Sequence, residues 1–316
     1  MDKRVCGILL SMCNSFSKNF DDKGNYQIII NGNILSNYCS SNTCSDNLEK
    51  INAGCLYLLD AFFKDNSVFK TDANSNINIV EYIIIWLSYM LSLKQQVGTN
   101  TNLQYFYNTT INNDKYQKSI TGVEQYYKNY KDLIDKKKDL INMDMSNISK
   151  LYDAFYALCM MHFEFNEKSP DCGKYLVKAK EFVEKYKKLN NVSDTNKDSP
   201  YNKLLSTLSN DYDNFKKKCE IAKCNNIPPL QPIDQTKITG DFSEHSKQTS
   251  ELTVKSSEVA SSSSITSNLF IVLSIFGAIA FFLGISYKYS LFGFRKRFQK
   301  QKLREKLKNI KKRMNQ

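Results

Sequence analysis

The feature that most constrains this chain is a long apolar run near its C-terminus, because it decides which solvent each part of the protein meets. The stretch from Leu269 to Ile285 is almost wholly apolar, and no charged residue occurs between Glu258 and Lys288. About 20 apolar residues in an α-helix cross roughly 30 Å of hydrocarbon, and a helix satisfies its own backbone groups, as lipid requires. A buried core helix is the alternative, but the strongly basic segment that follows disfavours it. We therefore predict one transmembrane helix at residues 268–288.

The residues after this run predict its orientation. Aromatic side chains at positions 287, 289, 292 and 294 suit the headgroup boundary, and Arg295, Lys296 and Arg297 follow them. Excess positive charge marks the cytosolic side of a span, so we place the C-terminus there. Residues 288–316 hold 12 of the 44 Lys and Arg but one of the 32 acidic residues, and thus carry +11 of the net +12. The rest of the chain is nearly neutral, so the high pI does not indicate a nucleic-acid partner.

The basic cytosolic tail, residues 289–316, has an apolar pattern of its own. Leu303, Leu307, Ile310 and Met314 recur at helical spacing among lysines. This pattern favours a tail that lies along the inner leaflet and binds anionic lipids. The alternative is a soluble flank that does no more than fix the orientation of the span. In both cases the lipid bilayer is a partner of the chain.

Upstream of the span, the chain divides into a linker and a folded part. Residues 229–267 are rich in Ser, Thr, Lys and Glu and poor in large apolar groups, above all from residue 236 onward, so we expect a flexible, disordered stalk. Residues 1–228, which we call the head, are long enough for a substantial core. Their apolar residues recur at helical spacing. We predict a mainly α, multi-helix ectodomain, with helices near residues 5–16, 46–62, 79–93, 123–141, 148–163, 170–186 and 199–215.

Local patterns sharpen this prediction. Asp46 and Glu49 resemble a capping box at the start of one helix. The apolar stretch from Ile79 to Leu93 is too short to span a bilayer and contains Glu81, so we expect a central helix that is buried on most sides. Asn31-Gly32 indicates a small hairpin over residues 26–35. The N-terminus resembles a signal peptide weakly, because its apolar run is short and interrupted, so we expect the C-terminal span to serve as the targeting signal.

The nine cysteines all lie in the head, on one side of the predicted span, at positions 6, 13, 39, 44, 55, 159, 172, 219 and 224. This distribution favours an oxidising compartment and disulfide bonds, with at least one thiol left over. The alternative is that they are buried free cysteines acting as small hydrophobic residues. Two C-x4-C pairs, Cys39/Cys44 and Cys219/Cys224, suit a disulfide that closes a local loop or links helices better than a four-cysteine zinc site. We therefore expect no metal.

The sequence offers little catalytic chemistry. It has two histidines, of which His162 lies in the apolar stretch CMMHFEF and is typical of a core histidine, while His245 falls in the stalk. No metalloprotease, nucleophile-elbow or phosphate-binding motif occurs. The lysine-rich stretches KDLIDKKKDL and VEKYKKL are balanced by nearby acids, as expected for solvated helix faces. We expect no enzyme activity and no cofactor.

Several segments together resemble one known family. In the head these are YCSSNTCSDNLEKINAGCLYLLDAFF, EYIIIWLSYMLSLK, LYDAFYALC and YNKLLSTLSNDYDNFKKKC. Around the span they are SIFGAIAFFLGISYKYSLFGFRKR and LREKLKNIKKRMNQ. The chain resembles the Plasmodium interspersed repeat (PIR) proteins, and its C-terminal segments are similar to the rodent-parasite members. The stalk is the part that varies within that family.

The resemblance implies a non-enzymatic, single-pass variant surface antigen of malaria parasites. Such a protein would be exported to the infected red-cell membrane or to parasite-derived membranes, with its N-terminal domain outside. Roles in antigenic variation, immune evasion or host-cell adhesion follow, with a host surface receptor or antibodies as partners. The alternative is an internal scaffold or trafficking protein of parasite-derived membranes. We expect variable surface loops at residues 66–78, 98–115 and 189–198, which are polar and rich in asparagine.

The resemblance also bears on the cysteines. Cys6, Cys39, Cys44, Cys55, Cys159, Cys172 and Cys219 match cysteines that recur in the family, where their role would be structural. With Cys224, they make eight disulfide candidates. The connectivity stays open, because eight paired cysteines allow 105 arrangements.

Overall fold

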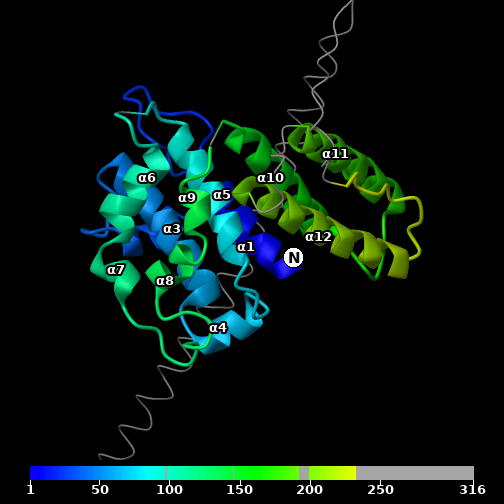
Figure 1. The fold of residues 1–316 in the computed structure, drawn as a ribbon, viewed down its shortest axis with the longest axis horizontal. Helices are drawn as coiled ribbons and strands as arrows, with labels where there is room; N and C mark the ends of the chain where they lie inside the picture. Colours follow the sequence, from blue (N-terminus) through cyan, green and yellow to red (C-terminus); the bar gives the residue numbers. More distant parts are fainter. Residues whose placement is uncertain (97, 145, 192–198, 233–316) are drawn as a thin grey trace, which may run out of the picture. The chain divides into compact units, whose positions relative to one another are not determined.

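The computed structural model describes residues 1–232, apart from 97, 145 and 192–198, and shows a head built from helices (Figure 1). The described residues belong to one compact unit, Met1–Phe242. The α-helices are α1 (Lys3–Cys13), α2 (Gly32–Leu35), α3 (Asn47–Phe63), α4 (Asn66–Thr71), α5 (Ile79–Ser92), α6 (Asn102–Phe106), α7 (Asp114–Gln117), α8 (Tyr130–Asp135), α9 (Lys138–Ile141), α10 (Ile148–Glu164), α11 (Cys172–Asn190) and α12 (Pro200–Ile221). A 3-10 helix, η1 (Ser36–Tyr38), and a π-helix, η2 (Tyr107–Ile111), complete the described elements.

The centre of the head is α5, as its sequence predicted. Nearly every side chain of this helix is buried, including that of Trp86, and α1, α3, α6 and α10 pack around it. Its one acid, Glu81, is 5% exposed and is compensated by Lys137, 2.6 Å away, and by the hydroxyl of Thr207, 2.7 Å away. A buried carboxylate with both an ion pair and a hydrogen bond satisfies the requirement that buried charge be compensated. The short apolar run is therefore a core helix.

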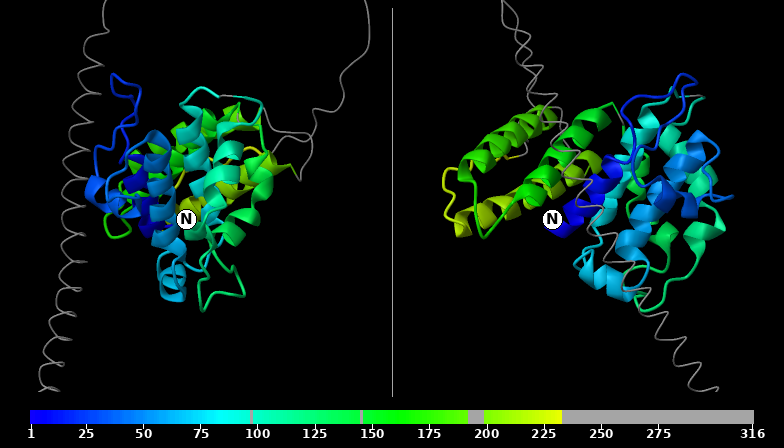
Figure 2. Two further views of the ribbon diagram at one scale, coloured as in Figure 1. Left: turned by 90° about the vertical axis from the view of Figure 1, so that its left-hand side faces the viewer. Right: turned by 180° about the vertical axis from the view of Figure 1, so that it is seen from behind.

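The C-terminal part of the head is a three-helix layer. α10, α11 and α12 contact one another, as the right-hand view of Figure 2 shows, and α10 also packs against α1 and α5. Ser199 caps α12 by accepting a hydrogen bond from the Asn202 N–H, with Pro200 in the first turn. Asp171 caps α11 in the same way through the Lys174 N–H. α10 thus joins the C-terminal layer to the rest of the core.

Some local predictions need correction. Asp46 caps α3 through the Glu49 N–H, but the Glu49 carboxylate accepts from the N–H groups of Ser40 and Ser45 instead of completing a capping box. Asn31 adopts the left-handed conformation (φ 62°) that the expected turn requires, but the hairpin over residues 26–35 does not form, because Gly32 starts α2. The lysine-rich helix expected over residues 123–141 is broken into turns, α8 and α9. The expected loops 66–78 and 98–115 contain short helices, and part of 189–198 lies outside the described residues.

The membrane prediction falls outside the part of the chain that the structure describes. Among the described residues, no helix combines the length and apolar character that crossing a bilayer requires. The stalk from residue 233, the span at 268–288 and the tail at 289–316, with Arg295, Lys296 and Arg297, all lie beyond these residues. The transmembrane helix and its orientation therefore remain predictions from the sequence.

Two disulfides form where the sequence allowed up to four. Cys39 bonds to Cys44, which closes a local loop, and Cys172 bonds to Cys224 across 52 residues. Of the eight candidates, Cys6, Cys55, Cys159 and Cys219 are buried free thiols in this structure, as is Cys13. The Met1 sulfur lies 3.5 Å from the Cys6 sulfur and 3.6 Å from that of Cys159, and burial raises the pKa of Cys55 to about 12. These cysteines thus pack as small apolar side chains.

The contact between α3 and α5 gives a prediction about packing. A Cβ atom on Gly54 would lie 2.5 Å from the Trp86 ring, which is fully buried. Gly54→Ala should therefore overpack the core and lower the free energy of unfolding by about 2–3 kcal/mol, despite the better helix propensity of alanine. Chemical denaturation of the purified chain measures this loss. Gly173→Ala is the control, because its Cβ would meet no atom closer than 3.7 Å. Equal stability of the Gly54 and Gly173 variants would contradict this packing.

Candidate binding surface

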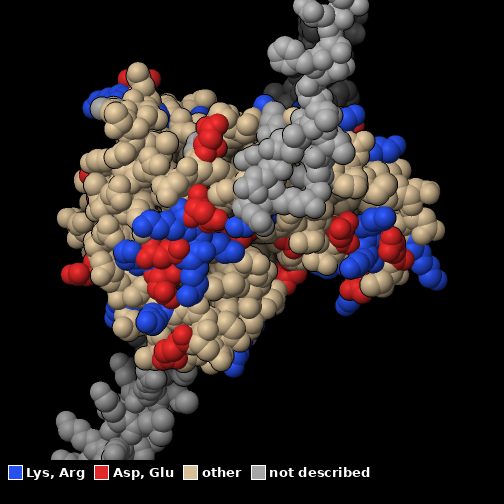
Figure 3. All heavy atoms as spheres, viewed as in Figure 1, with Lys and Arg blue, Asp and Glu red and all other residues tan. Residues whose placement is uncertain are grey.

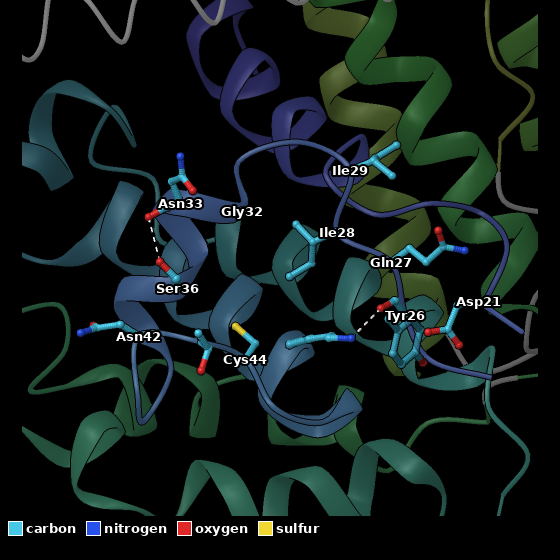
Figure 4. A pocket seen from close by; sticks show the side chains of 12 residues that line it. Asp21, Tyr26, Gln27, Ile28, Ile29, Gly32, Asn33, Ser36, Asn42 and Cys44 are labelled. Carbon is cyan, nitrogen blue, oxygen red and sulfur yellow. Dashed lines mark hydrogen bonds between the residues drawn. The ribbon is translucent and has the colours of Figure 1, made fainter. Parts of the chain in front are cut away.

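A surface groove lies beside the Cys39–Cys44 disulfide loop, in the N-terminal part of the head. We call it the loop groove; it has a volume of about 590 Å³ and is open to solvent. Figure 4 shows its labelled walls, with Ile28 facing the side of Ser36 and Cys44 across it. Its lining consists of Asp21, residues 26–29, Gly32, Asn33, Ser36, residues 42–44 and Lys50. The groove thus combines apolar, amide, hydroxyl and charged groups.

One wall of the loop groove is an extended segment, residues 26–30. An isolated antiparallel bridge joins Phe16 to Ile28, with hydrogen bonds from the Ser17 N–H to the Gln27 carbonyl and from the Ile29 N–H to the Ser15 carbonyl. Alternation along the segment buries the Tyr26 ring and leaves the Ile29 side chain 60% exposed. This wall therefore presents a strand-like edge and an apolar side chain to solvent.

The opposite wall is the disulfide loop. Cys39–Cys44 closes it, and Asn42, at φ 55°, takes the left-handed turn that so short a loop requires. The Glu49 carboxylate accepts hydrogen bonds from the N–H groups of Ser40 (2.6 Å) and Ser45 (2.8 Å). These backbone bonds lower the pKa of Glu49 to about 2. The disulfide thus closes the loop on itself, and two charge-assisted hydrogen bonds to Glu49 fasten the loop to the first turn of α3.

The two charged groups of the loop groove have opposite signs. The Lys50 ammonium donates to the Tyr26 carbonyl at 2.9 Å, and Asp21 accepts from the Asn25 N–H at 2.7 Å. Hydrogen bonds from the Asn25 backbone, and more weakly the charge of Lys50, lower the pKa of Asp21. With one acidic and one basic side chain in its lining, the groove has no net formal charge.

A second polar cluster, inside the head, has a structural role. The Asp211 carboxylate accepts from the Tyr82 hydroxyl at 2.6 Å, and the Nε2–H of His162 donates to the Asp211 carbonyl at 3.0 Å. His162 is 2% exposed, and burial, with nearby positive charge, lowers its pKa to about 3. A neutral ring enclosed in this way does not titrate near neutral pH and is a core histidine, as its apolar neighbours in the sequence predicted. Within the described residues, no three His, Cys, Asp or Glu side chains are grouped so as to hold a metal ion.

The lysine-rich stretch KDLIDKKKDL forms a solvated face, as its sequence predicted. Figure 3 shows Lys and Asp interleaved over α8 and α9. Lys131 pairs with Asp135 at 2.5 Å, Lys136 with Asp132 at 3.5 Å, and Lys203 with Asp139 at 3.7 Å. Exposed pairs of this kind contribute little to stability, about 0–1 kcal/mol each. They also neutralise the face, which therefore offers no basic patch to an acidic partner.

The sequence did not point to the loop groove. Among its lining residues, the sequence indicated Cys44 as a disulfide candidate and Gly32 as part of a hairpin turn. The available signal was the run of three isoleucines, 28–30, next to Asn31-Gly32, which indicated a hairpin but not an exposed edge. The expected variable loops lie elsewhere in the chain.

Comparison with known proteins decides the family. The profile of the family described as "Plasmodium variant antigen protein Cir/Yir/Bir" matches residues 6–288. The chain belongs to this family. The match extends through the head and stalk into the predicted span, so it includes residues beyond those that the structure describes.

A solved structure agrees with this assignment. The head of this PIR protein is similar to a chain described as "Structure of a Plasmodium PIR protein ectodomain", with 32% sequence identity and a TM-score of 0.56. The similarity covers 74% of this chain and 98% of the solved one. A search of curated proteins gave no match. The mainly α, disulfide-containing head therefore has the PIR ectodomain fold.

Proposed function

We propose that this PIR protein is a single-pass surface antigen of malaria parasites, exported to the infected red cell, with its head outside. The observation that carries the proposal is the family match, which runs from residue 6 to residue 288 and so includes both the head and the predicted membrane span. On this proposal the head serves antigenic variation, immune evasion or host-cell adhesion, and its partners are a host surface receptor or antibodies. The basic tail contacts anionic lipids of the inner leaflet.

The architecture of the head supports this proposal. Its core is a set of packed helices, and the disulfide loop on its surface is closed by the Cys39–Cys44 bond. A scaffold of this kind tolerates changes in surface residues while the core stays intact. That separation suits a family of variant antigens. The proposal includes no catalytic step.

Protease treatment of intact infected red cells tests the display of the head. Trypsin has sites in the stalk at Lys237, Lys247 and Lys255, so a head outside the cell should be released while the tail stays with the membrane. Separate antibodies against the head and against residues 289–316 follow the two parts. We expect most of the full-length signal at the surface to be replaced by a short, membrane-bound fragment that carries the tail.

Two controls make this result decisive. Cells permeabilised before treatment show that the protease can cut the chain, and a red-cell cytosolic protein shows that intact cells stay closed. Complete protection of the head in intact cells, with cleavage after permeabilisation, would reject surface display. That result would leave an internal scaffold or trafficking role in parasite-derived membranes.

A further inference from the structure

The extended wall of the loop groove has a main-chain edge at Ile28. Phe16 and Ile28 face each other without hydrogen bonds between them, because the two bonds of this bridge run between their neighbours. In an antiparallel pair of this type, the N–H and C=O groups of the facing residues point away from each other. The main-chain groups of Ile28 therefore point away from residues 15–17. Tyr26, two residues earlier, presents its own groups to the same side.

The two residues differ in how their main-chain groups are satisfied. The Tyr26 N–H donates to the Asn47 side-chain oxygen at 2.8 Å, and its carbonyl accepts from Lys50 at 2.9 Å. Both partners come from α3, which closes this part of the edge. For the N–H and C=O of Ile28, by contrast, the described residues provide no hydrogen-bond partner. Ile28 is half-buried and lines the loop groove, so a donor and an acceptor without a partner in the described part of the chain lie side by side at the groove.

The surroundings of Ile28 indicate the kind of ligand that fits. Gly32 leaves the space beside Ile28 open, since a Cβ there would be 3.9 Å from the Ile28 Cγ2 atom. Ile29 offers exposed apolar surface, while Ser36 and Asn42 line the other side with polar groups. Asp21 and Lys50 balance each other, so the complementary ligand carries no net charge. A peptide backbone supplies the matching acceptor and donor at the spacing of a strand.

We propose that the loop groove binds an extended, uncharged peptide segment of a partner protein, which pairs its main chain with Ile28. The added strand would extend the short pair formed by residues 15–17 and 27–29. Side chains on alternate residues of the peptide would contact the exposed Ile29 or enter the space beside Gly32. The inference rests on the proposed function in one respect, namely that the head is a recognition module.

The probe is a displayed library of linear 12-residue peptides, selected on the full-length chain in a mild non-ionic detergent. Gly32→Phe fills the groove, and Gly173→Phe is the matched control, because both glycines lie in the first turn of a helix and both have room for a Cβ atom. We expect the selected peptides to bind the Gly32 variant at least ten-fold more weakly than the wild type, and the Gly173 variant within two-fold of the wild type.

Two further measurements test the pairing itself. N-methylation removes one peptide donor at a time, so affinity should fall at least ten-fold at the residue that pairs with Ile28 and stay unchanged at the next residue. In wild-type protein, bound peptide should slow hydrogen exchange of the Ile28 amide at least ten-fold. This measurement needs no substitution, so it stays informative if the Gly32 variant fails to fold.

Three outcomes would overturn the inference. The first is that the peptides bind the Gly32→Phe variant as tightly as the wild type. The second is that N-methylation at every position leaves the affinity unchanged. The third is a wild-type dimer that Gly32→Phe dissociates, which would make a second copy of the chain the occupant. Protease protection of the head in cells would reject surface display without affecting peptide binding in solution. Failure of the peptide experiments, with the head cleaved on intact cells, would reject this inference alone.

Discussion

Replacing Cys172 and Cys224 together by serine is expected to lower the free energy of unfolding of the head by about 4 kcal/mol. The bond closes a loop of 52 residues, and it removes more entropy from the unfolded chain than the Cys39–Cys44 bond, which spans five. The same chain-entropy relation gives about 2 kcal/mol for the short loop. The long-range disulfide should therefore be the larger contributor, by about two-fold.

The position of this bond supports a large effect. Cys172 begins α11, and Cys224 follows the end of α12, where Lys223 adopts a left-handed conformation. The Cys224 N–H donates to the Cys219 carbonyl at 2.8 Å, and the Lys223 N–H to that of Glu220 at 3.0 Å, which is a Schellman arrangement. The disulfide therefore ties the start of one helix to a well-defined end of its neighbour.

Guanidinium unfolding of the wild type, of each double-serine variant and of all three after reduction measures these contributions. Each variant keeps the other disulfide. Reduction should therefore lower the free energy of unfolding of the Cys172/Cys224 variant by about 2 kcal/mol and that of the Cys39/Cys44 variant by about 4 kcal/mol. A larger loss from the Cys39/Cys44 variant would contradict the assignment. So would an unchanged stability of the wild type after reduction.

The second expected result concerns acid. The pKa of His162 is about 3 in the folded head, because burial disfavours the charged ring, whereas it is about 6.5 in the unfolded chain. The unfolded state therefore binds a proton that the folded state refuses, and stability falls as the pH drops from 6.5 towards 3. Between pH 7 and pH 4, protonation of His162 in the unfolded chain should lower the free energy of unfolding by about 3 kcal/mol.

His162→Gln isolates this contribution. Glutamine does not titrate, and its amide can replace the donor that His162 directs at the Asp211 carbonyl. Acidic groups with lowered pKa values, such as Glu49, lose their contributions in acid in both proteins. The difference in unfolding free energy between wild type and variant should therefore shift by about 3 kcal/mol, in favour of the variant, from pH 7 to pH 4. Parallel pH profiles would show that His162 is accessible to protons in the folded head.

Much of the fold followed from local sequence patterns. The spacing of apolar residues in Ile79–Leu93 and in CMMHFEF predicted buried helices because contacts at i, i+3 and i+4 decide helix faces within one segment. The cap at Asp46 also acts over three residues and was predicted correctly. The break between α8 and α9 was missed, because lysine-rich sequence supports a helix locally and tertiary packing decides where it ends.

The sequence by itself determined the helical class of the head, its buried central helix, and the family to which the chain belongs. It also predicts the span and basic tail, which lie beyond the described residues. Tertiary structure alone decided that Cys172 pairs with Cys224 while Cys219 stays a thiol, and that Ile28 has an open edge while Tyr26 does not. The physical reason is range: helix periodicity depends on neighbours a few residues apart, whereas disulfide pairing and edge exposure depend on which distant segments the folded chain brings together.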